Sequence, residues 1–191
     1  MLEREPAAPR AAASALADEG LAQLCTFRVG GEDYAIDIMR VREIIPPAPV
    51  TPVPRAPSFV EGVVRLRGDV IPVLDVRRRL GLPVTPATRK TKYLIVSVAG
   101  RRLGLVVDEV TEVLRIPRAL IRPPPALVEG GGPRFFLGVC GGEGGATATG
   151  RRSHARAGRI RLLLNVKALL DPVAPGEPDA ARSEAEATRR S

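Results

Sequence analysis

The sequence repeats one pattern in its two halves, which restricts the chain to folds that contain two copies of a small unit. Residues 26–45 (TFRVGGEDYAIDIMRVREII) align with residues 95–114 (IVSVAGRRLGLVVDEVTEVL). Residues 59–64 (FVEGVV) recur at 135–140 (FFLGVC), and residues 70–76 (VIPVLDV) recur at 160–166 (IRLLLNV), in the same order. The junction between two such copies is a natural place for a binding site.

Each copy reads as a series of short strands, because runs rich in Val, Ile and Leu alternate with Gly-containing turns. Five strands in a unit of this size predict a small barrel, since closure removes the exposed edges of a sheet. We therefore expect an all-β protein with two five-stranded barrels related by duplication, and short helices. Strands are expected at 24–29, 34–38, 59–66, 70–74, 93–99, 103–107, 110–116, 135–140 and 160–164, and residues 39–45 are expected to continue from the strand at 34–38. Helical turns are expected near 38–41, 75–80 and 165–170.

The composition along the chain predicts one folded body with tails. Residues 1–20 and 173–191 contain few bulky apolar side chains and are expected to be disordered, which leaves a body at 21–172. Its subdomains are expected at about 24–90 and 91–171, with possible strand exchange. The Pro-rich links 46–57 and 117–126 are expected to cross between the two lobes, and the Gly- and Arg-rich insert 141–158 is expected to be flexible.

Cysteine usage and the lack of a long apolar stretch predict a cytoplasmic protein. The net charge is +8, and all but three of the 29 basic residues are arginine, which fits either a GC-rich genome or an anionic partner. Cys25 and Cys140 are read as thiols of a reduced compartment rather than a disulfide framework. No stretch approaches the roughly 20 apolar residues that cross a bilayer, so no membrane insertion is expected.

Catalytic chemistry finds little support in the sequence. The single histidine, His154, lies in the predicted flexible insert, without cysteines or carboxylates at metal-ligand spacing. The glycines at 141–145 lack the Lys-Ser/Thr pair of a phosphate loop. We expect no catalytic residue, metal or cofactor.

Several polar residues stand in apolar surroundings. Arg65 and Arg67 flank Leu66, so strand alternation places both arginines on one face, and Arg67 precedes the turn glycine Gly68. An arginine at such a rim forms geometry-specific pairs with carboxylates or carbonyls, although an ordinary solvated strand charge fits equally well. Gly62 marks either a close backbone approach or a bulge.

These motifs resemble the CheW family of chemotaxis coupling proteins. The resemblance rests on VREI (41–44), FVEGVVRLRGDVIPVLDVR (59–77) and GLVVDEV (104–110), and covers about 24–171. It implies two SH3-like five-stranded barrels that share strands across a hydrophobic seam. It also implies a non-catalytic adaptor between the cytoplasmic hairpin tip of a methyl-accepting chemoreceptor and the regulatory domain of a CheA-type histidine kinase, in membrane-proximal arrays.

The resemblance also implies site residues. Leu127 takes the place of a kinase-contacting aromatic, and Arg65 stands where the family commonly has Asn. The receptor-binding positions map onto Val41, Glu43, Ile44, Gly62, Arg67, Gly68, Gly104, Val110 and Val113.

Two other interpretations stay open at this point. The positive charge and the predicted barrel also fit a nucleic-acid-binding protein, although the few aromatic residues occupy core-like positions rather than a stacking platform. The chain could also be a fragment or homologue of the kinase's own regulatory domain.

Overall fold

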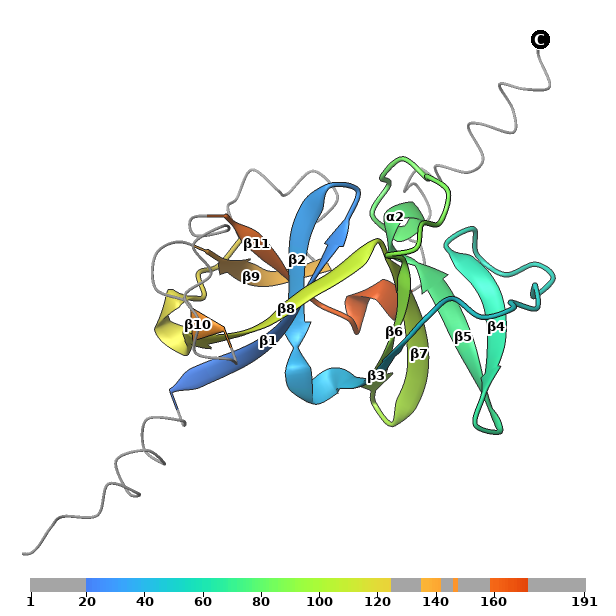
Figure 1. Cartoon of the computed structure of the whole chain (residues 1–191), viewed down its shortest axis with the longest axis horizontal. Coiled ribbons are helices and arrows are strands. Elements are labelled where there is room, and N and C mark those ends of the chain that lie inside the picture. Colours follow the sequence, from blue (N-terminus) through green and yellow to red (C-terminus); the bar gives the residue numbers. More distant parts are fainter. Residues whose placement is uncertain (1–19, 125–134, 142–145, 148–158, 172–191) are drawn as a thin grey trace, which may run out of the picture.

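The computed structural model describes residues 20–124, 135–141, 146–147 and 159–171. Sheet A, on the left of Figure 1, contains β1 (Leu21–Val29), β2 (Glu32–Asp37), β8 (Glu109–Pro117), β9 (Phe136–Cys140), β10 (Ala146–Thr147) and β11 (Arg161–Leu164). Sheet B, on the right, contains β3 (Val41–Ile45), β4 (Val60–Leu66), β5 (Asp69–Asp75), β6 (Lys92–Val98) and β7 (Arg101–Val107). Short helical turns are η1 (Ile38–Arg40), α2 (Val76–Arg79), η2 (Arg118–Leu120) and η5 (Ala168–Leu170).

The predicted all-β fold is confirmed, and η1, α2 and η5 lie within a few residues of the three helical turns that were expected. The helical turn η2 was not expected. Within the predicted insert 141–158, only Gly141 and β10 are described, and β10 pairs with β8. Both predicted tails lie outside the described residues, except that Gly20 at the end of the first tail is described. His154 and Leu127 also lie outside the described residues.

The two sheets exchange hairpins. The strand order is β10-β8-β1-β2-β11-β9 in sheet A and β3-β6-β7-β5-β4 in sheet B. The β1–β2 hairpin of the first copy therefore lies among strands of the second copy, and the β6–β7 hairpin lies among strands of the first. The registers of the two copies match as well. In sheet A, Phe27 pairs with Tyr34 and Val110. In sheet B, its counterpart Val96 pairs with their counterparts, Leu103 and Val41.

Among the described residues, neither sheet forms a continuous ladder around a barrel. In each sheet, however, an isolated bridge links a segment that follows a strand on one side to the edge strand on the other side. In sheet B, Thr51 follows edge strand β3 and bridges to Val63 on the other edge strand, β4. In sheet A, Arg122 follows β8 and bridges to Val139 on β9. Each sheet therefore curls back on itself.

The expectation that the Pro-rich links cross between lobes was wrong. Residues 46–59 join β3 to β4 within sheet B, and residues 118–135 join β8 to β9 within sheet A. The chain crosses between the sheets at η1, on the way from β2 to β3, and at Asp108, between β7 and β8. These Pro-rich links instead contain Thr51 and Arg122, the residues that form the isolated bridges.

Three apolar clusters fill the interior, and the largest joins the sheets. Within β6, Leu94 and Val96 face this inter-sheet core, whereas Tyr93 and Ile95 face the interior of sheet B, as strand alternation requires. The β6–β7 hairpin is consequently covered on both faces. The inter-sheet core includes Phe27, Val29, Ile36, Leu94, Val96, Leu103, Leu105 and Val107, and the interior of sheet A includes Leu24, Ala35, Leu114, Ile116 and Leu163.

Arg79 is buried where the two copies of the repeat meet, and it contacts residues of both. The guanidinium carbon of Arg79 lies 4.5 Å from the ring centre of Phe59 and 4.7 Å from that of Phe135, which stand at equivalent positions of the repeat. Arg79 also donates to three carbonyl oxygens at the end of η5, at distances of 3.1, 3.4 and 2.8 Å. These acceptors belong to Leu169, Ala168 and Asp171.

Candidate functional site

The turn between β4 and β5 holds Arg67 at one end of sheet B. Both turn residues have positive φ, 50° at Arg67 and 92° at Gly68, which is the geometry of a two-residue turn that matches the twist of a hairpin. An L-residue other than glycine adopts this conformation at a cost, and the Arg67 side chain is 78% exposed. The guanidinium is thus presented to solvent at the tip of the hairpin.

Arg67 contacts Glu43 across the open side of the sheet. The Arg67 Nη2 donates to the Glu43 Oε2 at 3.1 Å, joining the β4–β5 turn to the opposite edge strand, β3. A register shift between Val41 and Glu43 interrupts the pairing of β3 with β6, and such a bulge changes the direction of the side chains. The carboxylate of Glu43 is half-buried, so the pair has one sheltered partner and one solvated partner.

The apolar residues predicted for the site lie on β3 and β8. Val41 and Val110 occupy equivalent positions of the repeat, and both are half-buried against the inter-sheet core. Ile44 is 44% exposed and Val113 is half-buried. The core fills the space between the sheets, and Val41 and Val110 lie at its partly exposed rim.

Gly62 and Gly104 are buried and offer no side chain to a partner. A Cβ at Gly62 would lie 2.3 Å from the Thr51 carbonyl oxygen, so this glycine admits the bridging segment. A Cβ at Gly104 would meet Ile95 and Val73 at 3.4 Å inside sheet B. The structure therefore brings together Glu43, Arg67 and Gly68, whereas partner binding by any of the predicted positions stays a prediction.

Two neighbours of Arg67 were absent from the sequence prediction. Arg102, at the start of β7, pairs with Asp69, at the start of β5, at 2.8 Å. The two strands are parallel, so both begin at the same end of sheet B. Only knowledge of the exchanged hairpin could have placed Arg102 beside the β4–β5 turn.

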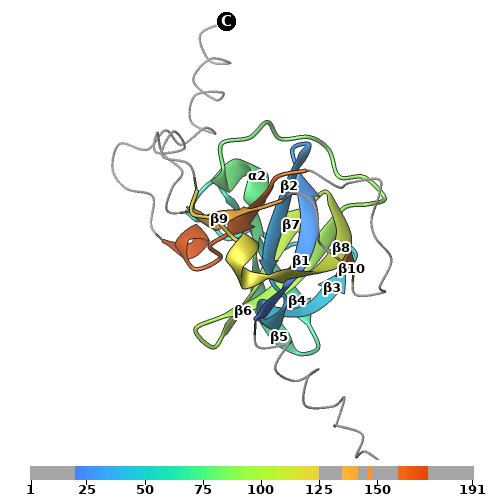
Figure 2. The same ribbon diagram turned by 90° about the vertical axis from the view of Figure 1, so that its left-hand side faces the viewer.

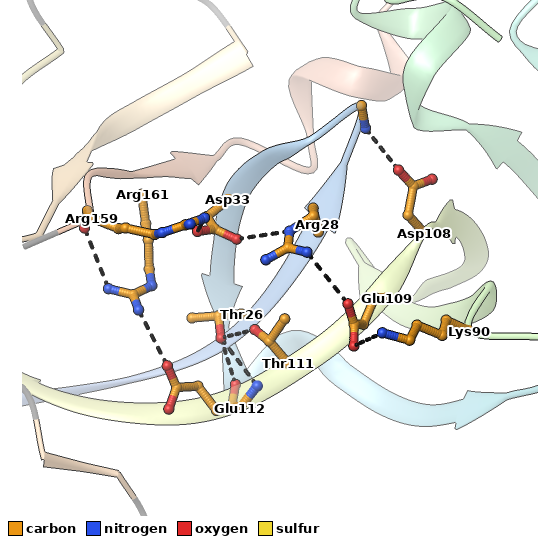
Figure 3. Close-up of polar contacts among 11 residues, drawn as sticks. Thr26, Arg28, Asp33, Lys90, Asp108, Glu109, Thr111, Glu112, Arg159 and Arg161 are labelled. Atoms are coloured by element: carbon orange, nitrogen blue, oxygen red, sulfur yellow. Dashed lines mark hydrogen bonds and ion pairs between the residues drawn. The ribbon is translucent and has the colours of Figure 1, made fainter. Parts of the chain in front are cut away.

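The corresponding end of sheet A carries charged side chains that pair with one another (Figure 3). Arg28 contacts Asp33 at 3.4 Å and Glu109 at 3.6 Å, and Arg159 reaches Asp33 at 3.4 Å. Lys90 contacts Glu109 at 3.2 Å. Among the described residues at this end, Arg28, Arg159 and Lys90 are therefore all paired with carboxylates.

Figure 3 also shows the residues around a bulge in β8, where the register of its pairing with β1 shifts between Thr26 and Phe27. Arg161 donates to Glu112 at 3.2 Å, and both side chains are largely buried. The buried Thr26 hydroxyl lies 2.6 Å from that of Thr111, donates to the Glu112 carbonyl and accepts from the Glu112 N–H. Glu112 matches Glu43 in the repeat. The arginine that pairs with Glu112, Arg161, is largely buried, whereas the arginine that pairs with Glu43, Arg67, is exposed.

Several of the described titratable groups have shifted pKa values. They are Cys25, Tyr34, Glu61, Tyr93 and Cys140. Burial raises the pKa of the Cys25 thiol to about 11 and also raises that of Cys140, which Arg161 partly opposes. The pKa of Glu61 is raised, first by burial and then by Asp75. A raised thiol pKa keeps the sulfur protonated, so neither cysteine is activated as a nucleophile.

The remaining features bear on the other functional classes. All six aromatic residues lie in the described part of the chain, where Phe136 is half-buried and the other five are buried, so no stacking platform faces solvent. Among the described residues, no group of three or more His, Cys, Asp or Glu side chains is arranged to hold a metal ion. The same residues contain no helix of the length and apolarity needed to span a membrane.

Comparisons with known proteins agree with this architecture. A family model described as CheW-like domain matches residues 23–173. The chemotaxis protein CheW of Rhizobium meliloti is 38% identical over 122 residues, which cover 64% of this chain and 79% of that protein. The CheW of Treponema pallidum is 35% identical over 121 residues, covering 61% and 71%. The crystal structure of the scaffolding protein TtCheW from Thermoanaerobacter tengcongensis superposes with a TM-score of 0.67 and 26% identity, over 81% of this chain and 90% of that one.

Proposed function

Because this chain belongs to the family of CheW-like proteins, we propose that it is an adaptor that couples chemoreceptors to a CheA-type histidine kinase in a chemotaxis-like pathway. The family resemblance of the sequence motifs is confirmed by the same match. The observation that carries the proposal is the extent of the family match, since residues 23–173 include strands of both sheets.

The receptor side of the proposal uses the rim of the inter-sheet core. A helical hairpin at the receptor tip lies along β3 and β8, with its apolar residues against Ile44, Val41, Val110 and Val113. Arg67 exchanges its exposed pair with Glu43 for a receptor carboxylate or carbonyl oxygen. Support comes from the solvent exposure of Arg67 and from the half-buried apolar residues on both strands. Gly62, Gly68 and Gly104 act through the backbone that they shape.

The kinase side of the proposal is coarser. The ends of the two lobes dock on the regulatory domain of the kinase by apolar contacts, with Leu127 as one contact. The assembly forms on the cytoplasmic side of receptor arrays. The adaptor performs no chemistry, and it transmits receptor state because it contacts the two states of the assembly differently.

A reconstitution tests this function. The full chain is mixed with a receptor cytoplasmic fragment and a CheA-type kinase, and kinase autophosphorylation is measured with and without the chain. We expect a change of at least about fivefold, within the usual range of coupling between sites. Failure to bind either partner, together with tight binding of duplex DNA at about 0.15 M salt, would favour the nucleic-acid alternative.

A further inference from the structure

One end of sheet B gathers arginines from four segments. These are η1, the start of β3, the β4–β5 hairpin and the start of β7, which all lie toward the bottom of Figure 1. The β4–β5 and β6–β7 turns also lie at the lower end in Figure 2. All six side chains are exposed. We call this surface the basic end, made of Arg40, Arg42, Arg65, Arg67, Arg101 and Arg102.

The carboxylates at this end neutralise only part of the charge. Glu43 pairs with Arg67 at 3.1 Å and Asp69 pairs with Arg102 at 2.8 Å. A third carboxylate, Asp37, accepts the Met39 N–H at the start of η1. The other four arginines of the basic end form no ion pair with any described residue.

The repeat supplies an internal comparison. Arg40 matches Glu109, Arg42 matches Thr111, and Arg101 and Arg102 match Glu32 and Asp33, all 69 residues apart. The corresponding end of sheet A therefore carries acids or a neutral residue at these four positions, and the arginines described there, Arg28 and Arg159, are paired (Figure 3). Since the same fold forms with either charge pattern, folding does not require the unpaired arginines of the basic end.

Apolar side chains stand among these arginines. Met39 is 79% exposed within η1, and Val70 is 62% exposed where it pairs with Arg65 across the hairpin. Isolated exposed apolar residues are ordinary, but two of them framed by unpaired arginines match a partner with an apolar stripe flanked by carboxylates. Nucleic acid fits less well, because no aromatic ring is exposed for stacking.

We infer that the basic end is a docking surface for an acidic amphipathic helix, whose carboxylates pair with Arg42, Arg65 and Arg101. The inference rests on the proposed adaptor function, since it names the chemistry of the receptor segment that lies beyond Arg67. The acidic flank is then a specificity element, because a neutral or basic helix leaves the arginines without partners.

The test uses a fluorescent amphipathic helical peptide with one Leu face flanked by Glu, and an analogue with Gln at every Glu. Binding to the full chain is followed by anisotropy at about 30 mM and about 300 mM NaCl, because salt screens exposed pairs. The triple variant Arg42→Gln, Arg65→Gln, Arg101→Gln is compared with Arg115→Gln, Arg118→Gln, Arg122→Gln. The control removes the same charge from exposed arginines of the other lobe.

We expect the Glu peptide to bind about tenfold more tightly than the Gln peptide at low salt. The basic-end triple should lose about tenfold, since each exposed pair contributes roughly two- to fivefold, while the control triple changes less than about twofold. Equal losses in both triples would mean attraction to net charge alone and would overturn the inference. Equal affinity of the wild-type chain for the two peptides, or stronger competition by duplex DNA than by unlabelled Glu peptide, would overturn it as well.

The kinase reconstitution separates this inference from the proposed function. If Arg67→Ala abolishes receptor coupling while the basic-end triple retains both coupling and Glu-peptide binding, the adaptor function stands and the inference is wrong. If the chain never couples receptor and kinase, yet the triple loses Glu-peptide binding, the acidic-helix surface stands and its assignment to a receptor is wrong.

Discussion

Gly62 in β4 and Gly138 in β9 occupy the same place in the two sheets. Each lies against a carbonyl oxygen of the segment that bridges to its strand. A Cβ at Gly62 would lie 2.3 Å from the Thr51 oxygen, and one at Gly138 would lie 2.6 Å from the Arg122 oxygen. No real Cβ approaches a backbone oxygen so closely. The recurring Gly-Val pair in FVEGVV and FFLGVC therefore reflects the room that the bridging segment needs beside β4 and beside β9.

Gly62→Ala should destabilise the fold by about 3 kcal/mol, because it adds a backbone clash to an unfavourable φ of 149°. Urea unfolding gives the free energy of unfolding. Gly20→Ala is the control, since a Cβ there meets nothing within 4 Å, and it should change stability by less than about 0.5 kcal/mol. Equal effects of the two substitutions would contradict the proposed role of Gly62.

Arg79→Met should cost about 3 kcal/mol, because it leaves three carbonyl oxygens at η5 without their buried charged donor and removes the ring contacts. The neighbouring Arg78→Met removes a more exposed pair with Asp75 and should cost less than about 1 kcal/mol. Thermal and urea unfolding measure both. A smaller loss at Arg79 than at Arg78 would show that the buried arginine does not fasten the copies together.

Arg67→Gly should separate stability from function. Glycine tolerates the positive φ of this turn position, so the variant should gain up to about 1 kcal/mol while it loses receptor coupling. Ala99→Gly is the matched control, since Ala99 has a φ of 48° in the β6–β7 turn. It should gain similar stability and keep coupling. Loss of coupling in both variants would shift the explanation from the guanidinium to hairpin rigidity.

The Cys25 thiol should make stability fall in alkaline solution. Its pKa is raised by burial from 9.0 to about 11, so the folded chain keeps a proton that the unfolded chain releases. The stabilisation is complete below about pH 9 and is lost as the pH rises through about 11, at roughly 1.4 kcal/mol per pH unit. Urea unfolding of the wild type and of Cys25→Ala at about pH 8 and pH 10.5 measures this. Parallel pH dependence of the two proteins would contradict it.

The strands were predictable because local signals determine them. Gly30-Gly31, Arg67-Gly68 and Ala99-Gly100 lie between alternating apolar runs, and all three become two-residue hairpin turns. The duplication likewise predicted that the two copies would share one plan. Arg67 could be singled out because its position before a turn glycine implies a rim.

Which strands of one copy pair with which strands of the other could not be predicted from the sequence. The Pro-rich links read as crossovers, since nothing local indicates that Asp108 alone carries the chain from β7 to β8. Contacts that depend on this exchange, such as Arg102 with Asp69, join residues far apart in the sequence. The predicted site list also combined exposed residues with the buried Gly62 and Gly104, because a motif does not distinguish residues that shape the backbone from residues that face a partner.

Receptor-dependent kinase activity of Arg67→Ala, compared with Arg115→Ala, tests the central claim most directly. Both arginines are exposed, and alanine at position 67 keeps the turn without its guanidinium. We predict that Arg67→Ala lowers coupling at least about tenfold, as loss of an interface hot spot does, with unchanged unfolding, while Arg115→Ala couples normally. Full coupling by a folded Arg67→Ala protein would contradict the account.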